Sequence, residues 1–213
     1  MKRGFFVTGT GTGVGKTFVT ALMARQVVAS GQRVFAFKPI ETGCPFVDGR
    51  RIGEDQELLA KAAGDWQQGE LRNLYSFERP LAPLAAARAE NRSIDLFHVE
   101  HVFGRGAEDA ELCLVEGAGG WRVPITESED MSSLAKQLGL AVLVVGEAGL
   151  GTINHTLLTV EAVRRDRCEL RLVVLSRRAE DDLELALENV REISRLGRCD
   201  VALSDDLDVM RIR

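Results

Sequence analysis

The chain has 213 residues, of which 45% are hydrophobic and 28% are charged, as in an ordinary globular protein. This length predicts a single domain, over residues 1–213, with a substantial buried core. The formal net charge of −5 argues against nucleic acid as a partner, because phosphate backbones bind basic surfaces. No apolar run approaches the roughly 18–20 residues that span a bilayer, and we find no signal peptide. We therefore expect a cytoplasmic protein without a membrane partner.

The first half of the chain is predicted to contain two strands and two helices. An apolar run at residues 4–7 ends in a glycine-rich loop, and residues 16–30 have the apolar spacing of a helix. A second apolar run lies at residues 34–37, and helical spacing returns at residues 54–63. Residues 64–91 contain scattered proline, glycine and arginine and show the least regular pattern.

The second half repeats this alternation. The apolar runs lie at residues 112–115, 141–145 and 172–175, and the helices are predicted at residues 94–103, 152–165 and 181–196. Because the runs are continuous rather than alternating, they suit parallel strands that are covered on both faces. The order of strands and helices predicts an α/β fold, a three-layer, doubly wound domain with a mostly parallel sheet.

The segment after the first predicted strand has the composition of a phosphate-binding loop. From Gly9 to Thr17 it reads Gly-x5-Gly-Lys-Thr, one residue longer than the usual P-loop spacing. Its glycines let successive backbone N–H groups turn toward a polyphosphate, and the next helix adds its positive end. Lys16 is predicted to reach the terminal phosphates and the Thr17 hydroxyl to bind Mg2+. A glycine-rich turn beside a solvated lysine is the alternative, but the order strand–loop–helix favours a P-loop NTPase.

Three more charged residues stand where such a fold binds its ligands, at or near the carboxyl ends of strands. Glu116 follows an apolar run and is suited to hold magnesium, although a carboxylate at a strand end can also face solvent. Lys38 follows another run, where a lysine more often extends into water than takes part in catalysis. Asp55 lies near the start of a helix, and spacing alone favours a capping role for it.

The cysteines and histidines do not form a recognisable metal or redox motif. The sequence has no Cys-x-x-Cys pair, and the cysteines have no nearby histidine. His98 and His101 are not at the spacing of a metal pair, so we expect surface or structural roles for them. Asn154 and His155 follow a Gly-Leu-Gly turn and are expected to open the next helix. The cysteines are Cys44, Cys113, Cys168 and Cys199.

Five motifs together resemble the dethiobiotin synthetase family. They occur in the family's order and at similar spacing, and the stretched Gly-x5-Gly-Lys-Thr loop is itself typical of that family. The resemblance extends from residue 4 to about residue 165. The motifs are Phe-Val-Thr-Gly-Thr at 6–10, Val-Gly-Lys-Thr at 14–17, Lys-Pro-Ile-Glu-Thr-Gly at 38–43, Val-Glu-Gly-Ala-Gly-Gly at 115–120 and Gly-Leu-Gly-Thr-Ile-Asn-His at 149–155.

The resemblance implies an ATP-dependent cyclo-ligase of biotin biosynthesis. The family closes a ureido ring on 7,8-diaminononanoate with CO2 and ATP, through a carbamate and a carbamic-phosphoric anhydride. Carbamate and γ-phosphate are both anions, so bringing them together requires fixed positive charge and metal. The resemblance also implies a homodimer with the diamine site at the subunit interface.

Residue roles follow from the same resemblance. Lys16, Lys38 and Thr12 are implied to be catalytic, and Thr17, Asp55 and Glu116 to be ligands of Mg2+, which replaces the capping role for Asp55. Contacts to the substrate are implied for Thr42 and, from the partner subunit, for Leu150, Gly151 and Asn154. The remaining nucleotide-binding positions are Gly11, Gly13, Val14, Gly15, Gly117, Ala118 and Gly119.

The sequence departs from the family pattern in its last quarter. The family commonly has an asparagine that reads adenine after the strand predicted at 172–175, and here Ser176 stands in its place. A later Gly-x-x-Pro turn near the base is not evident either. We therefore expect a weaker preference for ATP over other triphosphates than the family usually shows.

Three other functions share the phosphate-binding loop. A partition ATPase carries a second lysine early in the loop and a basic or amphipathic surface, and neither is evident here. A cobyrinate-type amidotransferase also needs a glutaminase with a nucleophilic cysteine, for which 213 residues leave little room. A nucleotide-binding regulatory subunit stays open, and it predicts ATP binding without turnover.

Overall fold

A parallel six-stranded sheet forms the centre of the protein in the computed structural model, which describes residues 3–47 and 49–212. The strand order is β10-β9-β8-β1-β7-β2, and every neighbouring pair is parallel. The sheet therefore confirms the predicted doubly wound α/β fold. Its strands are β1 (Gly4–Gly9), β2 (Val34–Phe37), β7 (Leu112–Gly120), β8 (Ala141–Glu147), β9 (Leu170–Ser176) and β10 (Val201–Leu203).

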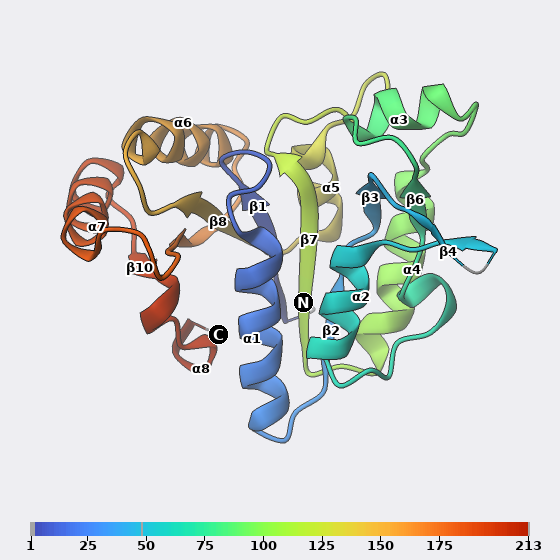
Figure 1. The fold of residues 1–213 in the computed structure, drawn as a ribbon, viewed down its shortest axis with the longest axis horizontal. Coiled ribbons are helices and arrows are strands. Elements are labelled where there is room, and N and C mark those ends of the chain that lie inside the picture. Colours follow the sequence, from blue (N-terminus) through green and yellow to red (C-terminus); the bar gives the residue numbers. More distant parts are fainter. Residues whose placement is uncertain (1–2, 48, 213) are drawn as a thin grey trace.

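Helices cover both faces of the sheet and make the three layers seen in Figure 1. One face packs against α1 (Lys16–Ala29), α2 (Glu54–Ala62) and α8 (Val209–Ile212). The other face packs against α4 (Leu96–Glu108), α5 (Met131–Leu138), α6 (Thr152–Arg165) and α7 (Leu183–Gly197). None of the described helices combines the length and apolar character needed to cross a membrane.

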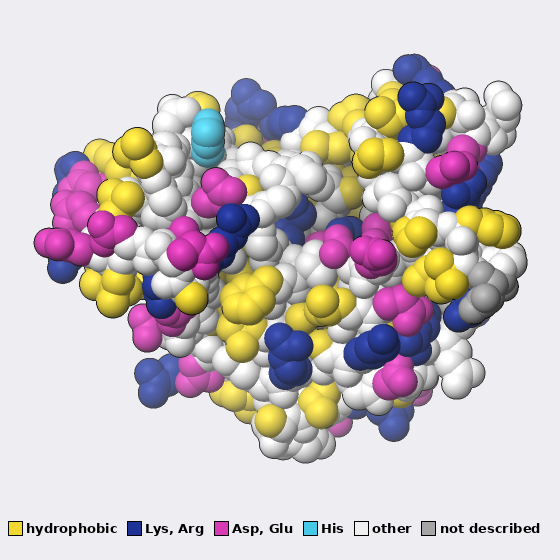
Figure 2. Space-filling view, in the orientation of Figure 1, with side chains coloured by type: hydrophobic (Ala, Val, Ile, Leu, Met, Phe, Trp, Pro, Cys, Tyr) yellow, Lys and Arg dark blue, Asp and Glu magenta, His cyan; other side chains and the backbone are white. Residues whose placement is uncertain are grey.

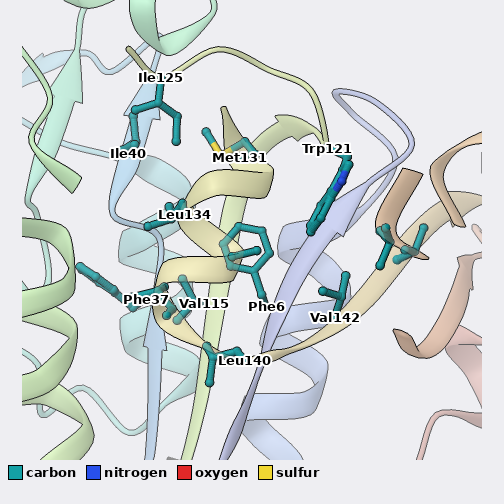
Figure 3. Close-up of a cluster of buried hydrophobic side chains, with 14 of the residues drawn as sticks. Phe6, Phe37, Ile40, Val115, Trp121, Ile125, Met131, Leu134, Leu140 and Val142 are labelled. Carbon is teal, nitrogen blue, oxygen red and sulfur yellow. The ribbon is translucent and has the colours of Figure 1, made fainter. Parts of the chain in front are cut away.

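Burial on both faces explains the continuous apolar runs. Successive residues of a strand point to opposite faces, so Phe5 and Val7 join the core under α1 while Phe6 joins the core under α5. Figure 3 shows Phe6 at the centre of that second core, and its ring meets the edge of Trp121 at a centroid distance of 6.3 Å. Both cores therefore stabilise β1, the strand that leads into the phosphate-binding loop.

The structure also contains elements that the apolar pattern did not predict. The irregular stretch 64–91 includes β6 (Tyr75–Phe77) and α3 (Pro83–Ala89), and β6 pairs with β3 (Ile40–Thr42). Strands this short present too few residues for a visible period. The strand predicted from the apolar run at 112–115, with Glu116 at its end, is longer in the structure, because β7 continues to Gly120. The remaining small elements are the hairpin β4 (Phe46–Val47) and β5 (Arg50–Arg51), with 3-10 turns at Gly69–Leu71 and Ser204–Asp206.

We expect the substitution Gly106→Ala to destabilise the protein. A Cβ at Gly106 on α4 would lie 2.3 Å from the ring of Phe35 on β2, so the helix and the sheet would have to separate. Overpacking of this kind costs about 1–3 kcal/mol, and the better helix propensity of alanine offsets roughly 1 kcal/mol at most. Urea denaturation should show a lower midpoint. Gly149→Ala is the control, since a Cβ there meets nothing within 4 Å, and an unchanged midpoint for Gly106→Ala would contradict the close contact.

Candidate active site

The phosphate-binding loop connects β1 to α1 at the carboxyl edge of the sheet. Gly13 and Gly15 have φ angles of 79° and 93°, which only glycine adopts at little cost. The buried Lys16 folds back so that its Nζ donates to the carbonyl oxygen of Gly11 over 2.8 Å. Figure 2 shows a hollow at the upper end of α1 with basic and acidic side chains around it. The loop thus has the turn, the lysine and the helix N-terminus that a polyphosphate requires.

A buried cluster of charges lies next to the loop. The fully buried Glu116 of β7 accepts a hydrogen bond of 2.8 Å from the Thr17 hydroxyl and lies 2.9 Å from Lys38 Nζ. Lys38 also pairs with Asp55 at the start of α2. The side chain of Lys38 is only 8% exposed, so the interpretation of Lys38 as a lysine that extends into water was wrong. The same burial rules out the solvent-facing interpretation of Glu116.

The surroundings shift the pKa values of the two lysines in opposite directions. Burial acts to lower the pKa of Lys38, but the charges of Glu116 and Asp55 outweigh it and raise the pKa above the ordinary value. Burial lowers the pKa of Lys16 to about 8, and the Lys38 charge adds to this while Glu116 opposes it. Lys38 therefore carries its charge at neutral pH, and the negative charge of a bound polyphosphate would raise the lowered pKa of Lys16.

Glu41 is a further residue of this site, which the sequence pattern did not predict. Its buried carboxylate on β3 accepts hydrogen bonds of 2.9 and 3.0 Å from the backbone N–H groups of Asp55 and Gln56. A Cβ at Gly53 would lie 2.3 Å from Glu41 Oε2, so glycine is needed where the carboxylate reaches the helix. Burial raises the pKa of Glu41, and the charge of Lys38 opposes that rise.

These contacts also bear on the role of Asp55, for which helix capping and binding of Mg2+ were considered. Gly53 occupies the N-cap position of α2 and makes no side-chain cap, and Glu41 satisfies the first N–H groups of that helix. The capping role favoured by spacing alone was therefore wrong, and the Asp55 carboxylate is directed to Lys38 instead. The sequence signal for Glu41 was its place in the Lys-Pro-Ile-Glu-Thr-Gly motif.

The charge cluster and the loop line one cavity of about 580 Å3. Thr42, Thr12 and Ala118 also line it, and Pro80 to Pro83 form its far wall. The cavity therefore brings together most of the predicted site residues. The predicted residues in its lining are Thr12, Gly13, Gly15, Lys16, Thr17, Lys38, Thr42, Asp55, Glu116, Ala118 and Gly119.

The other predicted residues lie outside this cavity. Val14 is buried in the core beneath α1, and Gly117 lies in β7 against the Phe6 ring. Leu150, Gly151 and Asn154 are exposed at the start of α6, and Leu150 has 94% of its surface accessible. These last three do not reach the cavity of their own chain. His98, for which no acidic partner was predicted, lies 2.9 Å from Glu70 on the surface.

A second cavity of about 490 Å3 lies on the opposite side of the phosphate-binding loop. It is formed by the loop, the ends of β8 and β9 and the segment that follows β9. Its lining includes Glu147, Ser176 and Arg178. Arg177 holds this segment in place, because it pairs with Asp205 over 2.5 Å and donates to the carbonyl oxygen of Asp181. The last quarter of the chain, where base selection was expected to differ from the family pattern, thus builds a wall beside the loop.

The fold and the loop define a nucleotide-binding protein of the P-loop class. Comparison with solved structures supports the fold: the chain is similar to a ParA family ATPase from Chlorobium tepidum TLS, with a TM-score of 0.56, 13% identity and coverage of 95% of this chain and 82% of that one. MinD in the MinC:MinD complex of Aquifex aeolicus gives 0.57 and 12%, with coverage of 94% and 80%. At this identity the likeness shows the fold alone.

Comparison of sequences identifies the family. The model of the AAA_26 family, described as an AAA domain, matches residues 3–204. The chain is 46% identical over 197 residues to ATP-dependent dethiobiotin synthetase BioD of Anaeromyxobacter dehalogenans strain 2CP-C, covering 91% of this chain and 85% of the relative. It is 38% identical over 192 residues to the BioD of Thermodesulfovibrio yellowstonii, covering 86% and 80%. The chain belongs to the dethiobiotin synthetase family, and its match continues well past residue 165, where the motif resemblance ends.

Proposed function

We propose that the protein is a dethiobiotin synthetase that joins 7,8-diaminononanoate and CO2 into a ureido ring at the expense of ATP. The observation that supports this most directly is Lys38, a buried cation between Glu116 and Asp55 in the cavity of the phosphate-binding loop. A fixed cation beside a polyphosphate site suits a reaction in which two anions must meet. The relatives, which are named ATP-dependent dethiobiotin synthetases, also favour this function over a partition ATPase or a regulatory subunit.

The proposed reaction has three steps. One amine of the substrate adds to CO2 and loses a proton, which gives a carbamate. A carbamate oxygen then attacks the γ-phosphorus of ATP and displaces ADP, which gives a carbamic-phosphoric anhydride. The second amine attacks the carbonyl carbon, the bond to phosphate breaks, and the ring closes with release of inorganic phosphate.

The chain's own residues would lower the barrier of these steps by holding charge in place. Lys16 and the loop N–H groups bind the terminal phosphates, and Thr12 lies on the cavity side of the loop. Lys38 neutralises the carbamate as it approaches the γ-phosphate. Thr42 is placed to contact the diamine. In the free protein Glu116 and Asp55 keep Lys38 charged and oriented.

The oxygen atoms around Lys38 fit a magnesium ion. Thr17, Asp55 and Glu116 supply a hydroxyl and two carboxylates, and Mg2+ prefers hard oxygen ligands together with phosphate oxygens. Within residues 3–47 and 49–212, Glu116 Oε2 is buried without a hydrogen-bond partner, which leaves one acceptor for a cation. Magnesium, when bound, would offset the charge of the β- and γ-phosphates.

We propose a homodimer in the cytoplasm, with part of the diamine site supplied by the partner. Leu150, Gly151 and Asn154 are exposed and lie outside the cavity of their own chain, which supports a role toward a neighbouring subunit. The start of α6 suits the carboxylate end of the substrate, because a helix N-terminus attracts anions.

Release of phosphate from ATP tests the proposed reaction. We expect release only when both 7,8-diaminononanoate and bicarbonate are present, together with Mg2+, and mass spectrometry should detect dethiobiotin. ATP binding without release under these conditions would instead identify a regulatory nucleotide-binding protein. Release that is independent of the diamine would favour a partition-type ATPase.

The substitution of Ser176 for the family asparagine predicts loose selection of the base. Ser176 lines the second cavity and packs against the loop, since its Oγ would lie 2.2 Å from a Cβ at Gly15, and it offers a single short hydroxyl where asparagine would offer an amide. We expect turnover with ATP and CTP to be similar at equal, subsaturating concentration. An ATP advantage of roughly a hundredfold, about 2.7 kcal/mol, would contradict this expectation.

A further inference from the structure

Phe18 is an exposed aromatic residue at the junction of the two cavities. Its side chain remains 49% accessible although it lies in the first turn of α1. The two cavities have only three lining residues in common, namely Gly13, Gly15 and Phe18. Figure 2 shows hydrophobic side chains exposed over the upper half of α1, beside the hollow. An aromatic ring left in water at this point has no evident structural task.

The direction of a helical side chain places this ring near the loop. Side chains on an α-helix lean toward the N-terminus, and Phe18 directly follows Thr17, the last residue of the phosphate-binding motif. The ring therefore covers the surface around the N-terminal end of α1, where a bound phosphate chain leaves the loop.

The position of the loop residues indicates which end of a nucleotide enters which cavity. Lys16 and Thr17, the phosphate- and magnesium-binding residues of the loop motif, line the first cavity and not the second, so the terminal phosphates belong there. The nucleoside then extends to the second cavity, beyond Gly13 and Gly15. On this path it passes Phe18, which lines both cavities.

We propose that Phe18 is the platform on which the nucleobase of the bound triphosphate stacks. Every base has a π-face, so stacking binds bases with little regard to their identity. This suits a second cavity in which the short Ser176 stands where the family commonly has an asparagine. The inference rests on the proposed binding of a nucleoside triphosphate and deepens it, but it does not depend on which reaction follows.

Calorimetric titration with two ligands tests the role of Phe18. The full chain is titrated with ATP and with inorganic tripolyphosphate, which has the phosphates but no base. We expect Phe18→Ala to weaken ATP binding by about 5- to 150-fold, the range that alanine substitution gives for one stacked base. Its affinity for tripolyphosphate should stay within about twofold of the wild type. Phe18→Tyr keeps an aromatic face and should restore ATP binding.

A matched control separates stacking from general surface effects. Phe97 on α4 is 76% exposed and distant from both cavities, so Phe97→Ala should change neither affinity. Equal weakening of ATP and tripolyphosphate by Phe18→Ala would overturn the proposal, because the ring would then support the loop. An unchanged affinity for ATP would overturn it as well. Since the assay measures binding alone, absence of ring closure would reject the proposed reaction without affecting this result.

Discussion

The Lys38→Ala variant is expected to bind ATP nearly as well as the wild type and to close the ring about a hundred to a thousand times more slowly. Removal of one fixed charge or donor that stabilises a developing anion typically costs this much in rate. The loop, Lys16 and the end of α1 stay in place, so the polyphosphate keeps its contacts. The measurement is the rate of dethiobiotin formation under saturating ATP, alongside the dissociation constant of ATP.

Stability must be measured together with activity in this variant. Without Lys38 the buried Glu116 loses its partner cation, and breaking a buried pair by removing one member costs about 3–5 kcal/mol. We therefore expect a lower melting temperature that Mg2+ partly restores. Lys61→Ala is the matched control, because Lys61 is an exposed lysine on α2, and it should change neither property. Wild-type rates of ring closure in Lys38→Ala would rule out the proposed role.

The Glu116→Gln variant is expected to need much more magnesium. Glutamine has nearly the same shape but lacks the charge, and it removes one of the two carboxylates that the site offers to a cation. Loss of an outer-shell partner already weakens metal binding by about 10- to 100-fold, so loss of a direct ligand should cost at least that. The Mg2+ concentration at half-maximal activity should rise accordingly, and direct Mg2+ titration of the protein with a bound ATP analogue should show the same shift.

A control residue next to the other end of β7 makes this result specific. Glu111 precedes β7 at the opposite end of the sheet and is exposed, where it accepts a hydrogen bond from the Arg33 N–H. Glu111→Gln should leave the magnesium requirement unchanged. An equal magnesium requirement in Glu116→Gln and the wild type would show that Glu116 serves only to orient Lys38.

The sequence predicted the elements of the central sheet better than their arrangement. Continuous runs such as residues 141–145 and 172–175 are buried on both faces, and this burial is a local signal. The position of β7 between β1 and β2 has no such local signal. It depends on packing between elements that lie about a hundred residues apart in the sequence. The helix Met131–Leu138 was missed for another reason: at eight residues it is short, although Asp130 and Ser133 form a capping box at its start.

Site residues were predictable from the sequence where a local motif defines both the residue type and its role. The glycines and Lys16 of the loop are of this kind. The burial of Lys38 was not predictable from spacing, because it results from a carboxylate on β7 and another on α2. The motif Lys-Pro-Ile-Glu-Thr-Gly contains Glu41, but the contacts of Glu41 were not predictable from spacing because its partners are backbone N–H groups.

The bonds from the Asp55 and Gln56 amides to Glu41 have a consequence for the segment between them. They join two points of the chain that are 14 and 15 residues apart, so residues 42–54 form a closed loop with its ends held together. Phe46 in the hairpin of this loop is 68% exposed. Because the closure fixes both ends, we expect changes of length between Phe46 and Arg51, at the tip of this loop, to leave Asp55 in its position beside Lys38.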